Sequence, residues 1–374
     1  MVLRKSIKPF LSLAAIAAIG GLGAQARASV PVGIPQPAHV VVVMEENANY
    51  DQIVGDTTDA PYINNTLLNG ALVFTNSHGV EHPSQPNYLD FFAGGNQGIN
   101  DANGTAANPL NFGPGANYSG DAFPSSTNFN NFTSLPFTGA NLGSELAAAN
   151  VSFTQYAENL PVDSNGNVNI STIDNATTGA AMTNGYARRH DPVVNWVATN
   201  PTGNQLPLSA DQPFTNINWQ GTNFSSLPKV SLIIPNTIDD GHDGSSTAVR
   251  VANTDHFLQT QLANYVTWAK TNNSLMIVTW DENDYVEASN QILTVMAGDP
   301  SLFQAGTSNQ NVNHYNFLRT IEDMYGTGYA GASATASDLA FSNGQFTTVT
   351  PEPAALGLFG VGIAGLLLRR RRMA

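Results

Sequence analysis

The sequence contains no cysteine. This absence excludes a thiolate nucleophile and cysteine-ligated zinc, and no disulfide can stabilise the fold. Positive charge is also scarce, because 14 lysines and arginines stand against 28 aspartates and glutamates, which gives a formal net charge of −14. A chain of this charge repels nucleic acid and anionic membrane surfaces at long range. We therefore expect no nucleic-acid partner.

Residues 1–28 have the pattern of a cleaved secretory signal. Arg4, Lys5 and Lys8 form a basic start, the apolar run FLSLAAIAAIGGLGA follows, and the small-residue segment ARA precedes Ser29. The sequence thus predicts export, with a signal peptidase as a processing partner.

The other end of the chain, PEPAALGLFGVGIAGLLLRRRRMA (351–374), joins a Pro-Glu-Pro triplet to an apolar run and four arginines. It resembles the PEP-CTERM sorting signal, in which these parts occur in this order at the C-terminus. The resemblance implies transient membrane anchoring until an exosortase removes the tail, which leaves the protein in the cell envelope or outside the cell. A permanent anchor is the alternative, but the apolar run 354–368 has 15 residues, fewer than the roughly 20 of a spanning helix.

Four apolar runs rich in β-branched residues predict strands that are buried on both faces of a parallel sheet. They cover residues 39–44, 229–235, 274–280 and 291–298. Helical patterns alternate with them near Pro61, near Ser144, over 254–271 and over 314–326. This alternation predicts an α/β fold, a three-layer sandwich with a largely parallel central sheet.

The segments 96–138 and 163–184 are rich in small polar residues without periodicity, and we expect them to be long surface loops. We assign 29–330 to one folded domain, 331–350 to a spacer and 351–374 to the sorting signal. The part between the two processed ends holds six basic and 27 acidic side chains, a formal net charge of −21. Such an excess of carboxylates favours metal sites.

Three of the predicted strands end in polar clusters. The first gives Glu45, Glu46 and Asn47, the second Asn236, Asp239, Asp240, His242 and Asp243, and the third Asp281, Glu282 and Asp284. Ligands bind at the carboxyl ends of the strands in open α/β sheets, and oxygen ligands from separate strands suit a divalent cation. Taken singly, each cluster is equally well explained by solvated turn residues or helix caps. Their repetition after three buried strands indicates a metal site.

Ser84 lies in VEHPSQPNYLD, between two prolines and directly before a helical pattern. One interpretation is a helix cap, because serine satisfies backbone N–H groups that have no intrahelical partner. The other is a nucleophile, because a helix N-terminus binds the oxygens of a phosphoryl group that the hydroxyl can attack. This stretch by itself supports both interpretations.

An ordered set of motifs resembles the phosphoesterase family of bacterial and fungal acid phosphatases and bacterial phospholipases C. The motifs, within residues 39–326, are HVVVVMEENANYDQIVG, APYINNTLLNGALVFTNSHGVEHPSQPNYLDFFAG, SFTQYAENLP, YARRHDPVVNW, IPNTIDDGHDGS, IVTWDEND and NHYNFLRTIEDMYG. The fold of this family is similar to the alkaline phosphatase core, in agreement with the predicted sandwich. The resemblance implies a hydrolase that acts on phosphoric ester bonds.

The resemblance also implies roles for individual residues. A divalent metal ion of unidentified kind is expected to be held at the first and third strand ends, facing the serine, by Glu46, Asn47, Ser84, Asp281 and Glu282. Ser84 is expected to be the nucleophile, activated by the metal, and to form a phosphoserine that water hydrolyses. Glu45 stands directly beside Glu46, so adjacency to Asn47 is the only ground for choosing Glu46 as the ligand.

Histidines are the candidates for proton transfer and phosphate binding. An imidazole with a pKa near neutral can protonate a leaving alkoxide or bind phosphoryl oxygens. His242 is the first candidate and His82 the second. His314 opens a helical pattern, where a capping or packing role is the alternative. The remaining histidines are weaker candidates: His39, His78, His190 and His256. Among them, His190 follows the motif YARR and could lie near the pocket.

We expect a small soluble phosphate monoester as the substrate, with Asn87 and Asp240 in contact with it and Asp239 as the alternative to Asp240. A phospholipase C is the close alternative within the family, and it would need an apolar entrance for lipid. The aromatic residues of FGPGANYSGDAFPSSTNFNNF permit such an entrance. A non-catalytic envelope or exopolysaccharide-associated protein is the alternative from another class, and its mark would be loss of the nucleophile or of a ligand pair.

Overall fold

The computed structural model describes residues 30–97, 136–169, 184–285, 287 and 289–341. The predicted secretory signal, the sorting signal and most of the predicted loop 96–138 lie outside the described residues. Within the described part, none of the helices combines the length and the apolar character that crossing a membrane requires.

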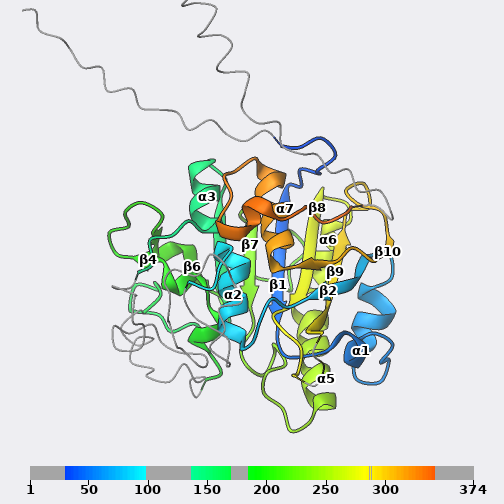
Figure 1. The fold of residues 1–374 in the computed structure, drawn as a ribbon. Helices are drawn as coiled ribbons and strands as arrows, with labels where there is room; N and C mark the ends of the chain where they lie inside the picture. Colours follow the sequence, from blue (N-terminus) through cyan, green and yellow to red (C-terminus); the bar gives the residue numbers. More distant parts are fainter. Residues whose placement is uncertain (1–29, 98–135, 170–183, 286, 288, 342–374) are drawn as a thin grey trace, which may run out of the picture.

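A nine-stranded sheet forms the centre of the described structure (Figure 1). Its strands follow the order β10-β2-β9-β8-β1-β7-β3-β6, and β11 pairs with β2. In chain order they are β1 (His39–Glu45), β2 (Leu72–His78), β3 (Phe153–Ala157), β6 (Asp211–Pro213), β7 (Val230–Ile234), β8 (Ser274–Trp280), β9 (Gln291–Gly298), β10 (Gly306–Ser308) and β11 (Val312–Asn313). A separate pair consists of β4 (Val197–Ala198) and β5 (Leu206–Pro207).

β1 lies in the middle of this sheet, and all seven of its residues are buried. It pairs in parallel with β8 on one side and with β7 on the other. Among the strands of the described sheet only β9 is antiparallel to its neighbours. The four strands predicted from the sequence are confirmed, each to within one residue at its ends.

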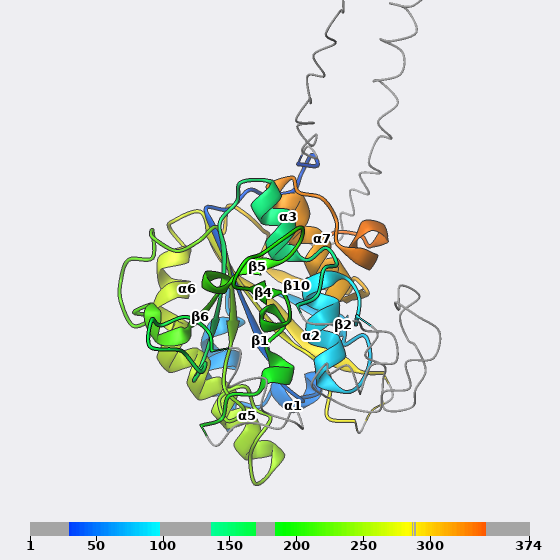
Figure 2. The ribbon, with the colours of Figure 1, turned by 90° about the vertical axis from the view of Figure 1, so that its left-hand side faces the viewer.

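Helices cover both faces of the sheet (Figure 2). On one face lie α2 (Ser84–Ala93), α3 (Leu142–Ala148) and α7 (His314–Tyr325), and on the other α1 (Tyr50–Ile53), α5 (Thr247–Phe257) and α6 (Ala263–Ala269). Val40 and Val42 belong to the first apolar core, whereas Val41 and Val43 belong to the second. The alternation of side chains along β1 therefore divides the core into two layers. The structure confirms the predicted α/β fold, a three-layer sandwich with a largely parallel central sheet.

Caps set the ends of the helices. Asn313 accepts a hydrogen bond from the backbone N–H of Tyr315 at the start of α7, and Gly326, with φ of 61°, ends it close to the predicted boundary. The helix predicted for 254–271 begins earlier, at Thr247, because the Ser246 side chain accepts a hydrogen bond at its N-terminus. A π-helical turn separates α5 from α6.

The first part of the predicted spacer packs on the domain. Residues 331–341 contact α7, and Leu339 is only 2% exposed in the core of that face. The guanidinium of Arg319 donates to the backbone carbonyls of Ser333, Ala334 and Ala336. The sequence did not predict this docking, because the segment is rich in small polar residues and shows no apolar periodicity.

Glu322 on α7 offers a test of this docking. Its Oε1 accepts a hydrogen bond from Ala330 N at 2.7 Å, and its Oε2 accepts one from the Ser333 hydroxyl at 2.5 Å. Burial raises the pKa of Glu322 to about 8. The unfolded chain releases this proton near pH 4.5, so the wild type loses stability as the pH rises from 4.5 through 8.

We expect Glu322→Gln to remove this loss, because glutamine keeps the shape of the neutral acid. Relative to wild type, the free energy of unfolding should rise by several kcal/mol, on the order of 4, between pH 5 and pH 8. Urea unfolding curves at a series of pH values measure the difference. A difference that stays constant with pH would contradict the assignment of a neutral Glu322.

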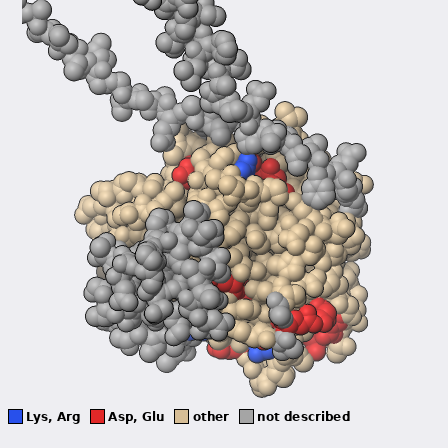
Figure 3. All heavy atoms as spheres, in the orientation of Figure 1, with Lys and Arg blue, Asp and Glu red and all other residues tan. Residues whose placement is uncertain are grey.

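Charged side chains are sparse on the face shown in Figure 3, and acidic atoms exceed basic ones there. The described residues contain six basic side chains, Arg188, Arg189, Lys229, Arg250, Lys270 and Arg319. One of the six, Arg189, lies beside the candidate site described next.

Candidate active site

The three predicted polar clusters meet at one edge of the sheet. β8, β1 and β7 are neighbours and run parallel, so their carboxyl ends lie side by side. Glu46 and Asn47 follow β1, Asp281 and Glu282 follow β8, and the segment with Asp240 follows β7. This edge is where open α/β sheets bind ligands.

Ser84 is the first residue of α2 and is 2% exposed. Its hydroxyl does not cap the helix, because the residue at the cap position is Pro83 and no side chain makes a cap hydrogen bond there. The Oγ donates instead to Glu46 Oε2 at 2.9 Å and to Glu282 Oε1 at 3.1 Å. Ser84 therefore begins the helix while its hydroxyl faces two carboxylates.

Of the residues predicted to hold a metal ion, Glu46 and Glu282 contact this hydroxyl, and Asn47 and Asp281 contact each other. Asn47 N donates to Asp281 Oδ1 at 3.3 Å, and Asn47 itself has a φ of 50°. Two buried oxygens, Asn47 Oδ1 and Asp281 Oδ2, have no hydrogen-bond partner among the described residues. Burial and the neighbouring Glu282 raise the pKa of Asp281 well above its usual range.

This donor set fits a cation. The carboxylates of Glu46 and Glu282 both contact the serine hydroxyl, and buried carboxylates are normally paired or bound to metal. Oxygen ligands of this kind suit a hard or borderline divalent ion. A bound ion would also give Asn47 Oδ1 and Asp281 Oδ2 the partner that the described residues do not supply.

The structure separates Glu46 from Glu45. Glu45 is fully buried, and neither of its carboxylate oxygens has a hydrogen-bond partner among the described residues. Burial, together with Asp240 and Asp239, raises the pKa of Glu45 well above its usual range. Because Glu46 contacts the serine and Glu45 does not, the geometry supports Glu46 as the candidate ligand.

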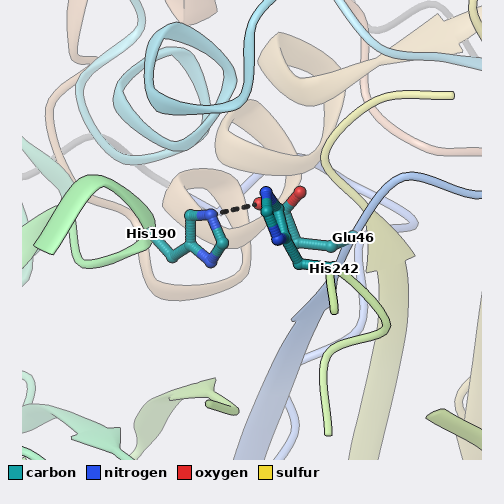
Figure 4. Close-up of side chains that lie close together, drawn as sticks. All are labelled: Glu46, His190 and His242. Atoms are coloured by element: carbon teal, nitrogen blue, oxygen red, sulfur yellow. Dashed lines mark ion pairs between the residues drawn. The ribbon is translucent and has the colours of Figure 1, made fainter. Parts of the chain in front are cut away.

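His190 lies at the centre of the site, between two acids. Its Nε2 is 3.0 Å from Glu46 Oε1, and its Nδ1 is 2.9 Å from Asp240 Oδ2. Figure 4 shows the ring directed at Glu46, with His242 beside that carboxylate. Burial lowers the pKa of His190 well below its usual range. Glu46, His190 and His242 lie close enough together to hold a metal ion.

The sequence favours His242, His82 and His314 over His190 as candidates. His190 lies in a short 3-10 helix, Arg188–His190. This helix does not follow any of the predicted strands, so the rule that ligands bind at strand ends does not point to it. Only the YARRHDP motif indicated a place near the site, and nothing in its spacing revealed contact with Glu46.

Asp240 contacts both His190 and His242. It is fully buried, and its Oδ1 accepts a hydrogen bond from His242 N at 2.7 Å in addition to the His190 contact. Burial and Glu46 raise the pKa of Asp240. The predicted contact of Asp240 with substrate stays a prediction, since both its oxygens already have partners. Asp239 contacts Asn236 instead.

His82 lies at the other carboxylate. Its Nδ1 is 2.5 Å from Glu282 Oε2, and its side chain is 26% exposed. The ring stacks on Tyr285 with the centroids 4.1 Å apart. Ser84, Glu282 and His82 thus form a continuous chain of hydrogen bonds that reaches the surface.

Asn87 and His314 lie behind these groups. Asn87 is fully buried, its Oδ1 accepts from the backbone of Val80 and Glu81, and its Nδ2 donates to Glu81 O. His314 is also fully buried and its Nε2 is 2.6 Å from Asp281 O, while burial lowers its pKa to about 4. The predicted roles of Asn87 in substrate binding and of His314 in catalysis stay predictions, since the hydrogen bonds of both side chains go to protein backbone.

The comparisons with known proteins identify the family of this chain. The family model described as the phosphoesterase family matches residues 57–328. The chain belongs to the phosphoesterase family. The match includes Ser84, His190 and Asp281, whereas Glu46 and Asn47 lie just before it. This phosphoesterase is a hydrolase that acts on phosphoric ester bonds.

Curated relatives carry phosphatase names. The chain is 37% identical over 338 residues to a phosphatidylinositol-3-phosphatase of Mycobacterium tuberculosis, covering 87% of this chain and 93% of the relative. It is 25% identical to a probable acid phosphatase of Kluyveromyces lactis over 75% of this chain, and 22% identical to an acid phosphatase of Aspergillus fumigatus over 75% of it. The chain spans slightly more than half of these two fungal proteins, 56% and 53%.

Solved structures similar to this phosphoesterase include two bacterial proteins. One is a protein in the alkaline phosphatase superfamily from Vibrio parahaemolyticus, 10% identical, with a TM-score of 0.46 over 84% of this chain and 72% of that chain. The other is the C-terminal periplasmic domain of EcEptC from Escherichia coli, in complex with Zn, 12% identical, with a TM-score of 0.47 over 88% of this chain and 94% of that chain.

The C-terminal tail of this phosphoesterase also matches a known motif. Residues 349–372 match the PEP-CTERM protein-sorting motif. The motif indicates export to the cell envelope or the extracellular space and implies processing by an exosortase. Signal-peptide cleavage near residue 28 stays a prediction.

Proposed function

We propose that this phosphoesterase hydrolyses phosphate monoesters through a covalent phosphoserine at Ser84. The observation that carries the proposal is the position of the Ser84 hydroxyl, 2.9 Å from Glu46 Oε2 and 3.1 Å from Glu282 Oε1. A serine that only capped α2 would direct its oxygen at backbone N–H groups. Here a buried hydroxyl faces two groups that can accept its proton, which is the arrangement of an activated nucleophile.

In the first step Ser84 Oγ forms a bond to phosphorus while the bond from phosphorus to the ester oxygen breaks. The electron pair of that bond goes to the ester oxygen, and the hydroxyl proton passes to a carboxylate, Glu46 or Glu282. In the second step water attacks phosphorus, the bond to Oγ breaks, and Ser84 regains a proton. The products are an alcohol and inorganic phosphate.

His82 is the group we assign to protonation of the leaving alcohol. Its contact with Glu282, at 2.5 Å, connects it to the nucleophile. A proton released by Ser84 to Glu282 can therefore be balanced by one that His82 gives to the ester oxygen. His242, whose ring lies beside Glu46, is assigned to the phosphoryl oxygens (Figure 4).

A divalent cation completes the proposed site. Glu46, Asn47, Asp281 and Glu282 would hold it, with Ser84 facing it. A cation bound there lowers the pKa of the serine hydroxyl and offsets the negative charge of the phosphoryl group. Asp281 is itself positioned by the Asn47 backbone and, through its own carbonyl, by His314.

The relatives indicate which esters to test. The Mycobacterium tuberculosis relative, of which the alignment covers 93%, is named a phosphatidylinositol-3-phosphatase. A phosphatidylinositol phosphate is a monoester on a lipid headgroup, so it is the second candidate substrate beside small soluble monoesters. The net charge of −14 favours the soluble class, because it opposes sustained binding to anionic lipid. A non-catalytic role would be marked by a missing nucleophile or ligand, and none of these residues is missing.

The test is phosphate release by the purified chain from p-nitrophenyl phosphate and from phosphatidylinositol 3-phosphate in neutral vesicles. Rates are measured before chelation, after chelation and after return of single divalent ions. We expect activity to fall by about 100-fold or more with chelator and to return with one ion, because the cation activates the nucleophile.

The two substrates separate the alternatives. Release from p-nitrophenyl phosphate supports a soluble monoesterase, and release from the lipid alone supports a phosphoinositide phosphatase. Cleavage of bis-p-nitrophenyl phosphate with no activity on either monoester would instead indicate a phosphodiesterase of the phospholipase C type. Inactivity on every ester with every ion would exclude the proposed function.

A further inference from the structure

Tyr285 is an exposed aromatic residue at the rim of the candidate site. It is 54% exposed, and its ring stacks on the imidazole of His82 with the centroids 4.1 Å apart and the planes inclined at 29°. The Nδ1 of the same imidazole is 2.5 Å from Glu282 Oε2, and Glu282 Oε1 accepts a hydrogen bond from Ser84. Tyr285 therefore contacts the outer end of the hydrogen-bonded chain that begins at the proposed nucleophile.

The backbone of Tyr285 has an unfavourable conformation. Its φ is 67°, in the left-handed region. Seven described residues other than glycine have a positive φ, of which five are asparagines, one is a glutamine and one is Tyr285. Asparagine tolerates this region, whereas a bulky side chain there is an outlier. Such a conformation persists only where the surrounding structure enforces it, and strained residues of this kind cluster at functional sites.

Buried amide side chains enforce this conformation. The Oδ1 of Asn283 accepts a hydrogen bond from Tyr285 N at 3.0 Å. Asn283 is itself fully buried, and its own backbone N–H donates to Asn290 Oδ1 at 2.8 Å. The backbone N–H of Asp284, directly before Tyr285, donates to Asn49 Oδ1 at 3.1 Å. The turn that presents Tyr285 is thus fixed by hydrogen bonds to three buried amides.

One of these amides also binds the segment that carries His82. Asn290 is 8% exposed, and while its Oδ1 accepts from Asn283 N, its Nδ2 donates to Glu81 O at 3.1 Å. Glu81 directly precedes His82 in the chain. A single side chain therefore connects the turn of Tyr285 to the backbone beside His82. The fold itself determines how the two rings meet.

We propose that Tyr285 is a positioning residue, whose ring holds the imidazole of His82 in the orientation in which it protonates the leaving alcohol. The proposal deepens the proposed function and rests on it. The contact of Nδ1 with Glu282 places one edge of the imidazole but does not by itself determine the tilt of the ring. The flat face of Tyr285 sets this tilt. A general acid must lie within hydrogen-bond reach of the ester oxygen, and a displacement of about 1 Å can cost 10²-fold in rate.

The leaving group distinguishes this role from other roles of the same ring. An alkoxide needs a proton in order to leave, whereas p-nitrophenolate leaves readily without one. A residue that acts through the general acid therefore matters for alkyl esters and little for p-nitrophenyl phosphate. A general loss of structure would slow both reactions alike. Direct stacking of Tyr285 on the substrate would mainly affect the aromatic ester.

The first experiment measures kcat/KM of the metal-loaded full chain for glycerol 2-phosphate and for p-nitrophenyl phosphate. Tyr285→Ala should lose about 10- to 100-fold on the glycerol ester and less than about threefold on the nitrophenyl ester. Tyr285→Phe keeps the ring and should recover most of the lost rate. The control is Val249→Ala, which shortens an exposed side chain of α5 and should equal wild type on both esters.

A double-mutant cycle connects the effect to His82. His82→Ala should show the same selective loss on glycerol 2-phosphate. Adding Tyr285→Ala to it should cause little further loss, because the tyrosine then has no imidazole to position. Additive losses, equal losses of Tyr285→Ala on the two esters, or a larger loss on the nitrophenyl ester would each overturn the proposal.

The second experiment needs no turnover. In NMR spectra of the Zn²⁺-loaded chain with labelled histidine, the ring current of Tyr285 shifts the ring protons of His82 upfield. His82→Ala identifies these signals among those of the seven histidines. Tyr285→Ala should move the signals downfield, whereas Tyr285→Phe should leave them near their wild-type positions.

Unchanged His82 signals in a folded Tyr285→Ala variant would show that the tyrosine does not hold the imidazole, which overturns the proposal. Thermal unfolding confirms that each variant is folded. A wild type that hydrolyses no ester would reject the proposed function, while the NMR signals still decide whether Tyr285 positions His82.

Discussion

Ser84→Ala is expected to lower kcat/KM for p-nitrophenyl phosphate by about 10³-fold or more, because it removes the atom that forms the bond to phosphorus. The variant should stay folded, since the change removes one hydroxyl from the first turn of α2 and leaves Pro83 at the cap position. Initial rates measured with saturating metal give the loss. Acid quenching followed by mass spectrometry should also find phosphate on the peptide that contains Ser84 in wild type only.

Ser226→Ala is the control, since Ser226 is exposed and lies in a loop before β7. Its rate should equal that of wild type. A rate for Ser84→Ala above a tenth of wild type, with no labelled peptide in wild type, would mean that water attacks the ester directly.

Glu46→Gln is expected to cost at least about 100-fold in metal affinity and a similar factor in activity, because it replaces a charged candidate ligand by a neutral amide. It also removes the carboxylate that accepts the hydrogen bond of Ser84 at 2.9 Å. Titration of the chelated protein with Mn²⁺, followed by rates at each metal concentration, separates weaker metal binding from a slower reaction.

Glu45→Gln is the matched control, since the same chemical change is made one residue away and both side chains are fully buried. Metal affinity should stay within about threefold of wild type, because Glu45 does not reach the serine. Burial raises the pKa of the Glu45 carboxyl well above its usual range. Wild type therefore loses stability as the pH rises above the ordinary value of 4.5, and the glutamine variant should be the more stable protein at pH 7. Equal loss of metal in both variants would refute the assignment of Glu46.

The strands that position the site could be predicted because each is an uninterrupted apolar run. β1, β7 and β8 read as buried strands, and their polar ends named most of the candidate ligands. β2 and β3 did not show this pattern. β2 carries Thr, Asn and Ser, and β3 buries Gln155, whose amide donates to Asp191 and Asp211. When a buried polar residue makes its hydrogen bonds to residues far away in the chain, the neighbouring sequence does not indicate that it is buried in a strand.

Local sequence also determined the sorting signal at the C-terminus and the start of α2. The PEP-CTERM tail is a contiguous motif, and its match needs no structure. The pattern around Ser84 predicted a helix start and left two interpretations of the hydroxyl. Neighbouring residues could not decide between them, because the atoms that Ser84 contacts come from positions 38 and 198 residues away.

Tertiary structure alone decided the second half of the site. His190 enters it from a short 3-10 helix with no strand before it, and Arg189 joins it through two imidazoles from different segments. The choice of Glu46 over Glu45 likewise depends on which carboxylate reaches Ser84 in space. The sequence by itself thus determined the layered fold and indicated the first candidate ligands, because buried apolar strands are visible as continuous runs and the candidates follow them directly. Partners that approach from separate segments were decided only by the fold, because their contacts depend on distances that no spacing along the chain encodes.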